Sequence, residues 1–451
     1  PHETVQIMAA SDMAPVVASH YGIPATASIL AFDSIQRLLA IGTLDGRIKV
    51  VGGENIEWLL ISPTSSPFKN LEFFQNQGLL VSVSNENEIQ VWDIDKRCIA
   101  CNVQWESNIT AFSVILGTSY MYAGDEYGFL SVLKYDADER NIVQLPYHMP
   151  PNLIAEGAKI PVSENQSIVG VLSQPSSGGK RVLIAYGNGL IILWDVTQDK
   201  AIHVKGNKNL ELKGSTVVSF SNSQSNASLN NLSDDDEAEK EIGSLCWASL
   251  DGSVLAVGYV DGDILLWDLS VSDNGKRQTT DVAKIQLSSG DRRLPVILLH
   301  WSSGRAHGRG GQLFVYGGED IGSDEVLTII DIDWSSSLAK LKCIERVDLR
   351  LHGSFADILV TSNAYEEENR NSTLLFILTN PGQLHLYKYE SLSILKSEKE
   401  KNGLIYSLEY NSVIPTVEPY MTVGKLYERS IQRNIFDVHT EVVEIINLDQ
   451  M

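Results

Sequence analysis

A short pattern of apolar and polar positions recurs seven times along this chain of 451 residues. Each copy consists of an apolar run, a tight polar turn and a second apolar run, and three copies end at Trp-Asp. In the copy at residues 254–268, the run Val254–Gly258 is followed by the turn Asp261-Gly262 and the run Ile264–Asp268. The other copies lie at residues 38–50, 79–93, 120–133, 182–195, 313–331 and 374–387. Strands and turns that repeat about every 40 residues are typical of β-propeller blades.

The pattern therefore predicts an all-β fold, a seven-bladed WD-repeat-like β-propeller with long disordered loop insertions. Every position of Ile264–Trp267 is apolar, as expected for an inner strand that is packed on both faces. The Asp-Gly and Asn-Gly turns supply the positive φ that a two-residue hairpin needs. We expect a bulky residue at Gly262 to cost about 1–2 kcal/mol through left-handed strain. The blades are predicted to begin near Ser28, Lys69, Asn108, Ser167, Gly243, Pro295 and Phe355.

The limits of the repeat divide the chain into three parts. Residues 1–24 are an unpatterned lead-in, residues 25–424 form the propeller, and residues 425–451 form an atypical C-terminal tail. Within the propeller, residues 205–241 are rich in Ser and Asn and then acidic, so we predict a disordered loop there. Residues 136–166 carry several prolines and no clear repeat, and we predict a long connection.

A propeller ring has to close on itself, because an open ring leaves unpaired strand edges. Closure normally requires a terminal strand that completes a blade. Residues 16–19 and 404–410 are the strand-like segments that the sequence offers for this role.

Composition narrows the classes of partner. The formal net charge is -22 and the isoelectric point is about 4.8, which disfavours binding to nucleic acid and to anionic membrane surfaces. Four cysteines are too few for a disulfide framework and suit a reducing compartment. The chain has no apolar run near the roughly 20 residues that span a bilayer. We therefore expect a cytoplasmic protein with no nucleic-acid partner and no membrane insertion.

Three longer phrases resemble a known family. They are His20–Pro24 with Ala27–Asp33 and Leu39–Thr43, then Leu183–Gly189 with Leu193–Asp195, then Pro295–Leu298 through Gly317-Gly318. Together they resemble the N-terminal propeller of the tomosyn and lethal giant larvae family of WD-repeat proteins, with wording closest to plant tomosyn-like members. The resemblance covers roughly residues 18–424.

The resemblance implies a non-catalytic interaction scaffold that regulates vesicle docking and exocytosis by binding syntaxin-type SNARE proteins. It also implies contact with Rab-type small GTPases in some members, and peripheral association with the plasma membrane. Members of the family carry two tandem propellers, and the tomosyn branch adds a C-terminal R-SNARE helix. Residues 425–451 do not resemble the family's next blade, and no heptad stripe with a central Arg is found in the sequence. Any SNARE contact is therefore expected to come from the propeller faces.

Motifs for chemistry are weak in this sequence. Cys98 and Cys101 have the spacing of half a zinc site or of a redox pair, but a zinc site needs four ligands, so packing in a strand is favoured. Gly178–Arg181 lacks the spacing of a phosphate loop and is better read as a hairpin turn. No HExxH or GxSxG sequence occurs. We therefore predict no cofactor, no metal and no catalytic residues.

Two loops are candidates for partner binding or regulation. One carries Ser233, Asp234, Asp235 and Asp236, a phosphorylation-site pattern that would also suit a basic partner, although a solvated loop is favoured. The other carries Arg305 and Arg309 on a Gly-rich tip.

Two alternatives to the scaffold stay open. The first is an activator or regulator of small GTPases, in which Arg305 or Arg309 acts as an arginine finger. Such a finger requires a rigidly placed guanidinium, and the four neighbouring glycines favour an exposed basic loop instead. The second is a truncated product with little independent activity, which the unfamiliar sequence after Tyr427 suggests.

Overall fold

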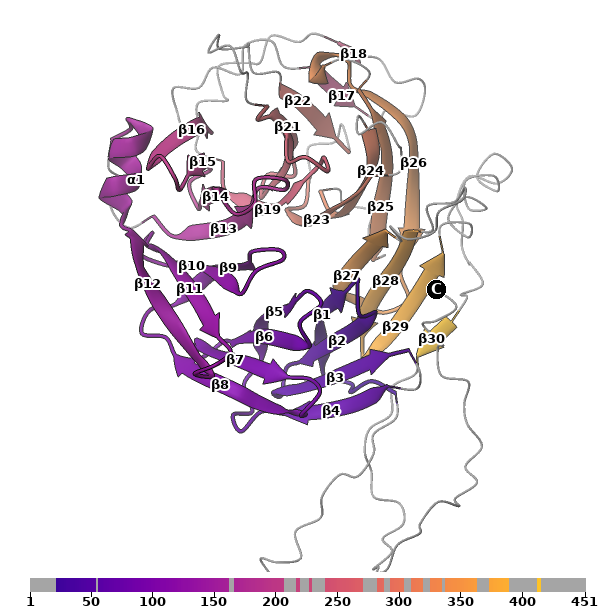
Figure 1. Cartoon of the computed structure of the whole chain (residues 1–451). Helices are drawn as coiled ribbons and strands as arrows, with labels where there is room; N and C mark the ends of the chain where they lie inside the picture. The colour runs from indigo at the N-terminus through magenta and orange to yellow at the C-terminus, as the bar shows by residue number, and fades with distance from the viewer. Residues whose placement is uncertain are drawn as a thin grey trace, which may run out of the picture.

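The fold was described from a computed structural model. The structure describes residues 22–53, 56–161, 166–206, 216–219, 227–228, 240–270, 282–287, 293–303, 310–318, 325–334, 337–362, 373–388 and 412–414. In this part of the chain, seven sheets stand around a central axis; the four repeat strands of each are antiparallel, and the first repeat strand lies nearest the axis (Figure 1). The predicted seven-bladed β-propeller is confirmed.

Each blade is built from consecutive strands. Blade 1 contains β1 (Ala27–Asp33), β2 (Leu38–Thr43), β3 (Arg47–Gly52) and β4 (Glu57–Ile61), and blade 2 contains β5 (Phe68–Phe74), β6 (Leu79–Ser84), β7 (Glu88–Asp93) and β8 (Cys98–Gln104). Blade 3 contains β9 (Ile109–Val114), β10 (Tyr120–Asp125), β11 (Leu130–Asp136) and β12 (Asn141–Met149), and blade 4 contains β13 (Ile168–Ser173), β14 (Arg181–Tyr186), β15 (Ile191–Asp195) and β16 (Lys200–Lys205).

The second half of the ring repeats this order. Blade 5 contains β19 (Ile242–Trp247), β20 (Val254–Tyr259), β21 (Ile264–Asp268) and β22 (Val282–Gln286), with β17 (Thr216–Ser219) and β18 (Ala227–Ser228) added outside β22. Blade 6 contains β23 (Val296–Ser302), β24 (Gly310–Gly317), β25 (Val326–Asp333) and β26 (Lys342–Arg350). Blade 7 contains β27 (Ser354–Ser362), β28 (Thr373–Asn380), β29 (Gln383–Lys388) and β30 (Ser412–Ile414). Each innermost strand begins within one residue of the predicted blade start.

Burial explains the apolar pattern from which the fold was predicted. The run Ile264–Trp267 forms β21, the third of the four repeat strands, and its side chains are buried on both faces. The innermost strand β19 is only partly buried, because it borders the central axis. Seven clusters of buried apolar side chains fill the joints between neighbouring blades, one cluster to each joint. The blades therefore share their cores, and no blade can bury its faces alone.

A register shift recurs where each innermost strand pairs with the second strand of its blade. It lies near the first residues of the innermost strand, for example between Val296 and Leu298 in blade 6 and between Phe355 and Asp357 in blade 7. Such irregularities increase the local twist of a strand. The recurrence in all seven blades indicates that the extra twist belongs to the repeat.

The ring closes by direct packing of blade 7 against blade 1. Leu374 and Phe376 of β28 are buried in one cluster with Leu30 and Leu39 of blade 1. The backbone N–H of Leu30 donates to Asp357 Oδ2 at 2.7 Å, so the innermost strands of the two blades are also joined. The outermost strand of blade 7 is β30, which pairs with β29. The predicted closing segments 16–19 and 404–410 lie outside the described residues.

Two predicted connections contain secondary structure. Residues 136–166 include the outer strand β12 and the helix α1 (Pro151–Ala158), which packs beside β16 at the rim of the ring (Figure 1). The prolines there suggested a loop, yet Pro146 lies in an outermost strand, where the missing N–H breaks no ladder, and Pro151 begins the helix. Residues 205–241 were predicted as a disordered loop, and the structure places the short strands β17 and β18 within this range.

The carboxyl group of Asp357 gives the closing joint a predicted pH dependence. Burial raises its pKa to about 7, although the N–H groups of Leu30 and Ile358 donate to it. In the unfolded chain this pKa is near its ordinary value of 3.8, so the folded state holds the extra proton between these two values. The free energy of unfolding therefore falls as pH rises through this window.

We expect Asp357→Asn to remove that part of the pH dependence, because an amide does not ionise. From pH 5.5 to pH 8, the wild-type free energy of unfolding should fall by about 1–2 kcal/mol more than that of the variant. Urea unfolding of both proteins at the two pH values measures the difference. Parallel profiles for the two proteins would show that Asp357 is ionised in the folded state throughout.

Candidate interaction surface on the turn face

One end of the ring is formed by two kinds of backbone segment: the turns between the second and third strands of the blades, and the loops that join one blade to the next. We call this end the turn face. In six blades the same bond ties these segments together, because an N–H at the start of the turn donates to a carbonyl just before the innermost strand. These bonds are Leu44 to Thr26, Asn85 to Pro67, Glu126 to Asn108, Gly187 to Ser167, Val260 to Glu241 and Gly318 to Pro295.

Glycine in these turns allows a close approach to the next inter-blade loop. A Cβ on Gly262 would lie 2.8 Å from Arg293 Cβ and 2.9 Å from Leu294 O, in the loop that leads to blade 6. A Cβ on Gly382 of blade 7 would lie 2.4 Å from Pro24 O, just before blade 1. The closing joint therefore uses the same backbone contact as an internal joint. Glycine at position 262 of the predicted turn is therefore required both for close packing against the loop before blade 6 and for the positive φ of the turn.

We expect Gly262→Ala to lower the free energy of unfolding by about 2–4 kcal/mol, since strain and steric overlap add. Gly117→Ala is the matched control, because Gly117 also has positive φ but has nothing within 4 Å of an added Cβ. The control should cost only the strain, about 1–2 kcal/mol. Denaturant unfolding of both variants measures the two costs. Equal costs would mean that the contact with the blade 6 loop is unimportant.

The turn of blade 5 holds a buried carboxylate among three cations. The Asp263 side chain is 1% exposed. Lys240 Nζ lies 2.5 Å from Asp263 Oδ2, Lys284 Nζ lies 2.9 Å from the same oxygen, and Arg293 Nη1 contacts Oδ1. Lys240 also reaches Asp261 Oδ2 at 2.9 Å. Because Lys240 precedes β19 and Arg293 precedes β23, one carboxylate ties together the loops on both sides of blade 5.

The ionisation of this cluster follows from its contacts. Burial alone would raise the pKa of Asp263, but the hydrogen bonds and charges of Lys240 and Lys284 outweigh burial and lower the pKa to about 2. Burial likewise opposes the charge on Lys240, and the carboxylates of Asp263 and Asp261 outweigh it and raise the lysine pKa. With three cations and two carboxylates, the cluster carries one net positive charge in a chain whose formal net charge is -22.

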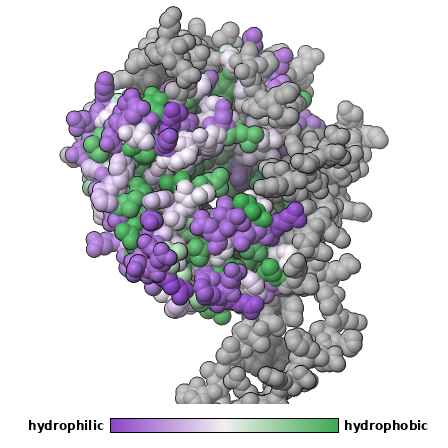
Figure 2. All heavy atoms as spheres, viewed as in Figure 1, coloured by the Kyte–Doolittle hydropathy of each residue, from purple (hydrophilic) through white to green (hydrophobic). Residues whose placement is uncertain are grey.

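Exposed apolar side chains adjoin this cluster. Val260 is 38% exposed in the same turn, and Leu294 and Ile297 are 46% and 57% exposed at the entrance to blade 6. The backbone places them together, because Gly262 packs on Arg293 and Leu294, while Gly317 packs on Pro295 and Ile297. We define the blade 5–6 patch as Lys240, Val260, Arg293, Leu294 and Ile297. In the space-filling view along the axis, small hydrophobic patches lie between hydrophilic residues (Figure 2).

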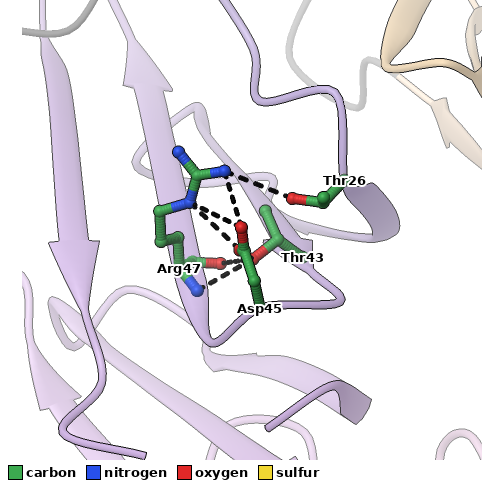
Figure 3. A network of polar contacts seen from close by, with 4 residues as sticks. All are labelled: Thr26, Thr43, Asp45 and Arg47. Atoms are coloured by element: carbon green, nitrogen blue, oxygen red, sulfur yellow. Dashed lines mark hydrogen bonds and ion pairs between the residues drawn. The ribbon is translucent and has the colours of Figure 1, made fainter. Parts of the chain in front are cut away.

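The corresponding turn of blade 1 is also held by an arginine but is balanced in charge. Arg47 Nη2 lies 2.7 Å from Asp45 Oδ2 and Arg47 Nε lies 3.0 Å from Asp45 Oδ1, while Thr43 Oγ1 donates to Asp45 Oδ1 (Figure 3). Arg47 Nη2 also donates to Thr26 Oγ1 at 3.4 Å, in the loop before β1. Burial opposes the ionisation of Asp45, but Arg47 and Thr43 outweigh it and lower the pKa. One cation meets one carboxylate, so this turn offers no net charge.

The candidate residues that the sequence singled out are not part of this surface as described. Ser233, Asp234, Asp235, Asp236, Arg305 and Arg309 all lie outside the described residues. Cys98 and Cys101 lie on the outer strand β8, and burial raises the pKa of Cys101 to about 11. Within the described ranges, no group of three His, Cys, Asp or Glu side chains could hold a metal ion. Gly178 and Gly179 lie in the turn between β13 and β14.

Sequence reasoning missed the blade 5 cluster because its members are far apart in the chain. Lys240, Asp263, Lys284 and Arg293 come from two inter-blade loops, a turn and an outer strand. The Asp261–Asp263 segment was predicted only as a turn. A second Asp directly after a turn glycine was the one local signal, because a carboxylate buried directly before a buried strand needs cationic partners there. In the described part of the chain, no helix is both long and apolar enough to span a membrane.

Comparison with known proteins supports the fold and the predicted resemblance. No protein-family model matches the chain. It is 26% identical to the rat (Rattus norvegicus) Lethal(2) giant larvae protein homolog 1 over 288 residues, which are 58% of this chain and 24% of that protein. It is 24% identical to the zebrafish (Danio rerio) LLGL scribble cell polarity complex component 2 over 213 residues, which are 42% of this chain and 20% of that protein. The matches thus span about a quarter of the length of these relatives or less.

A solved structure shows the same fold. The β-propeller domain of Cps50 (Swd1) from Myceliophteria thermophila superposes with a TM-score of 0.53 at 14% identity, covering 82% of this chain and 99% of that one. At this identity the likeness concerns the fold alone. The resemblance predicted from the sequence is confirmed by the relatives together with the seven blades: this chain is similar to the lethal giant larvae proteins and fits an N-terminal propeller of the lethal giant larvae and tomosyn type.

Proposed function

We propose that this chain is a non-catalytic protein-interaction scaffold in exocytosis and cell polarity, and that it binds syntaxin-type SNARE proteins through the turn face. The blade 5–6 patch is the observation that carries the proposal, since it combines exposed apolar side chains with a cationic cluster on an acidic protein. The similarity to a scribble cell polarity complex component and to a giant larvae protein supports the same class of function. Peripheral association with the plasma membrane would follow from the SNARE partner.

The chemistry of the patch suits a protein partner. Interfaces commonly combine an apolar centre with Arg side chains, and a few such residues carry most of the binding energy. Leu294 and Ile297 would supply the apolar centre, and Arg293 would meet an acidic group of the partner. The positive charge would also speed the encounter with an acidic partner at low salt. Asp263 holds Arg293 and Lys240 in place, so the patch is preorganised for binding.

We expect Leu294→Asp combined with Ile297→Asp to weaken binding of a syntaxin cytosolic domain by about tenfold or more, because apolar anchors become charged. Ile344→Asp is the matched control, since Ile344 is 52% exposed in the outer strand of the same blade. Fluorescence anisotropy with purified proteins measures both affinities. If the double variant still binds syntaxin, the blade 5–6 patch is not the binding site. If the wild-type chain does not bind syntaxin, syntaxin is not the partner.

The alternative function as a GTPase activator or regulator has its own test. Stimulated GTP hydrolysis by a Rab-type GTPase that is lost with Arg305→Ala and Arg309→Ala would favour catalysis over scaffolding. An unchanged rate of hydrolysis in the presence of the wild-type chain would leave the scaffold as the proposed function.

A further inference from the structure

The outer strand of blade 5 is more buried than those of blades 4 and 6. In β22 the side chains of Val282, Ala283 and Ile285 are buried. The outer strands of the neighbouring blades, β16 and β26, have mostly half-buried and exposed side chains, although Val347 and Leu349 of β26 are buried. These side chains of β22 pack in the two joints of blade 5, Val282 with blade 4 and Ala283 and Ile285 with blade 6. What the four repeat strands leave open is the outer hydrogen-bonding edge of β22.

An added strand from outside the repeat pairs with this edge. β17 pairs in parallel with β22, with Thr216 opposite Ala283 and Ser219 opposite Gln286, and β18 pairs antiparallel with β17. Blade 5 thereby becomes a six-stranded sheet, and β17 and β18 lie at the rim of the ring (Figure 1). The 3₁₀ helix of blade 6 (Leu338–Lys340) also packs against β22.

The position of β17 in the chain shows that it is not part of the blade. It lies in the segment between β16 of blade 4 and β19 of blade 5, so it precedes all four repeat strands of the sheet that it extends. Since four aligned residues hold it, β17 is a short segment bound to the edge of a complete four-stranded blade.

We propose that the outer edge of blade 5 is an acceptor site for an extended peptide, that β17 occupies this site in cis, and that a β-branched extended segment of a partner protein binds by replacing β17. Addition of a strand to a sheet edge is a recurrent mode of peptide recognition, in which main-chain bonds give affinity and alternate side chains give specificity. β17 shows the register and direction that such a segment takes. This site lies at the rim, and its acceptor strand β22 also carries Lys284, which contacts Asp263 of the turn face.

Occupation in cis sets the expected strength of competition. A tethered segment competes with a free one at an effective concentration that its linkers set and that can reach about 1 mM. A free peptide therefore binds the wild-type chain weakly, whatever its intrinsic affinity for β22. Opening of β17 exposes the edge and restores that intrinsic affinity.

A labelled synthetic peptide of residues 214–221, whose sequence is that of β17 and its flanks, is the probe. In the opened variant, Val217→Pro and Val218→Asp remove a ladder N–H and add a charge to β17. In the locked control, Ser219→Cys and Gln286→Cys join β17 to β22 through a disulfide at an aligned pair. We expect the opened variant to bind the peptide about tenfold or more tightly than the wild type, and the locked control to bind it least. Equal binding by all three proteins, or none by a folded opened variant, overturns the proposal.

Hydrogen exchange on the unmodified chain tests the same proposal without a variant. If β17 is a bound segment, its amides exchange through local opening much faster than those of β20 in the same blade. Excess peptide should then slow the exchange of β22. If β17 and β20 exchange together at the rate of global unfolding, β17 is a permanent strand and the proposal fails.

Discussion

Replacement of Asp263 by alanine should lower the free energy of unfolding by about 3–5 kcal/mol, which is one of the two largest effects expected in this molecule. The substitution removes the carboxylate that Lys240, Lys284 and Arg293 contact, while the side chains of Lys240 and Lys284 stay largely buried. Removing one member of a buried charge cluster is costly because the others keep their desolvation penalty. Urea unfolding near neutral pH measures the loss.

Two variants separate this charge effect from a loss of packing. Asp45→Ala removes a carboxylate at the corresponding turn of blade 1, where the side chain is 38% exposed, and should cost about 0–1 kcal/mol. Adding Lys284→Met to Asp263→Ala should restore part of the stability, because it removes one buried unpaired charge. A small effect of Asp263→Ala, or no rescue by the second substitution, would contradict the proposed role of the cluster.

The pH dependence provides a second readout for the same residue. The folded-state pKa of Asp263 is lowered to about 2 from an ordinary value of 3.8. Its contribution to stability is therefore present above the unfolded value and is lost as pH falls from about 4 towards 2. Asp263→Ala should show a shallower acid transition in that window, while Asp357 acts at higher pH and in the opposite sense.

Phe376→Ala should also lower the free energy of unfolding by about 3–5 kcal/mol, because it opens a cavity at the joint that closes the ring. Phe376 is buried between blades 7 and 1, with its ring centroid 6.0 Å from that of Phe32. Phe314→Ala is the matched control, since Phe314 is buried on the second strand of blade 6 at an internal joint. Denaturant unfolding of both variants compares the closing joint with an internal one.

The comparison of the two phenylalanines decides how the ring is held. Similar losses would show that blades 7 and 1 pack as firmly as consecutive blades, as their shared cluster and the Asp357 bond predict. A much smaller loss for Phe376→Ala would show that the closing joint opens before the rest of the ring unfolds. In that case the unfolding of the variant and the wild type would start from an open ring.

The repeat could be predicted from the sequence because each blade contributes a local signal. Apolar runs such as Ile264–Trp267 and turns such as Asp261-Gly262 are contiguous, and strand pairing within a blade follows the chain order. Segments outside the period gave weaker signals. The strand β12 was not predicted, because the prolines around Pro146 indicated a connection. The strand Thr216–Ser219 was not predicted either, because it lies in a stretch rich in Ser and Asn.

The candidate surface could not be predicted in the same way. Lys284 is an ordinary outer-strand residue in the sequence, and Arg293 and Lys240 look like residues of solvated loops. They become one cluster only because Asp263 is buried directly before β21, between two inter-blade loops that are far apart in the sequence. The exposure of Leu294 and Ile297 likewise depends on where blade 6 meets blade 5.

The order of strands, the number of blades and the location of the turns were thus all encoded in short-range patterns, because burial on two faces and positive φ are demands on neighbouring residues. Closure of the ring, the cationic cluster of blade 5 and the added strand β17 were decided by the tertiary structure. Each of these depends on which blades become neighbours in space, and the patterns within single blades do not specify such long-range contacts.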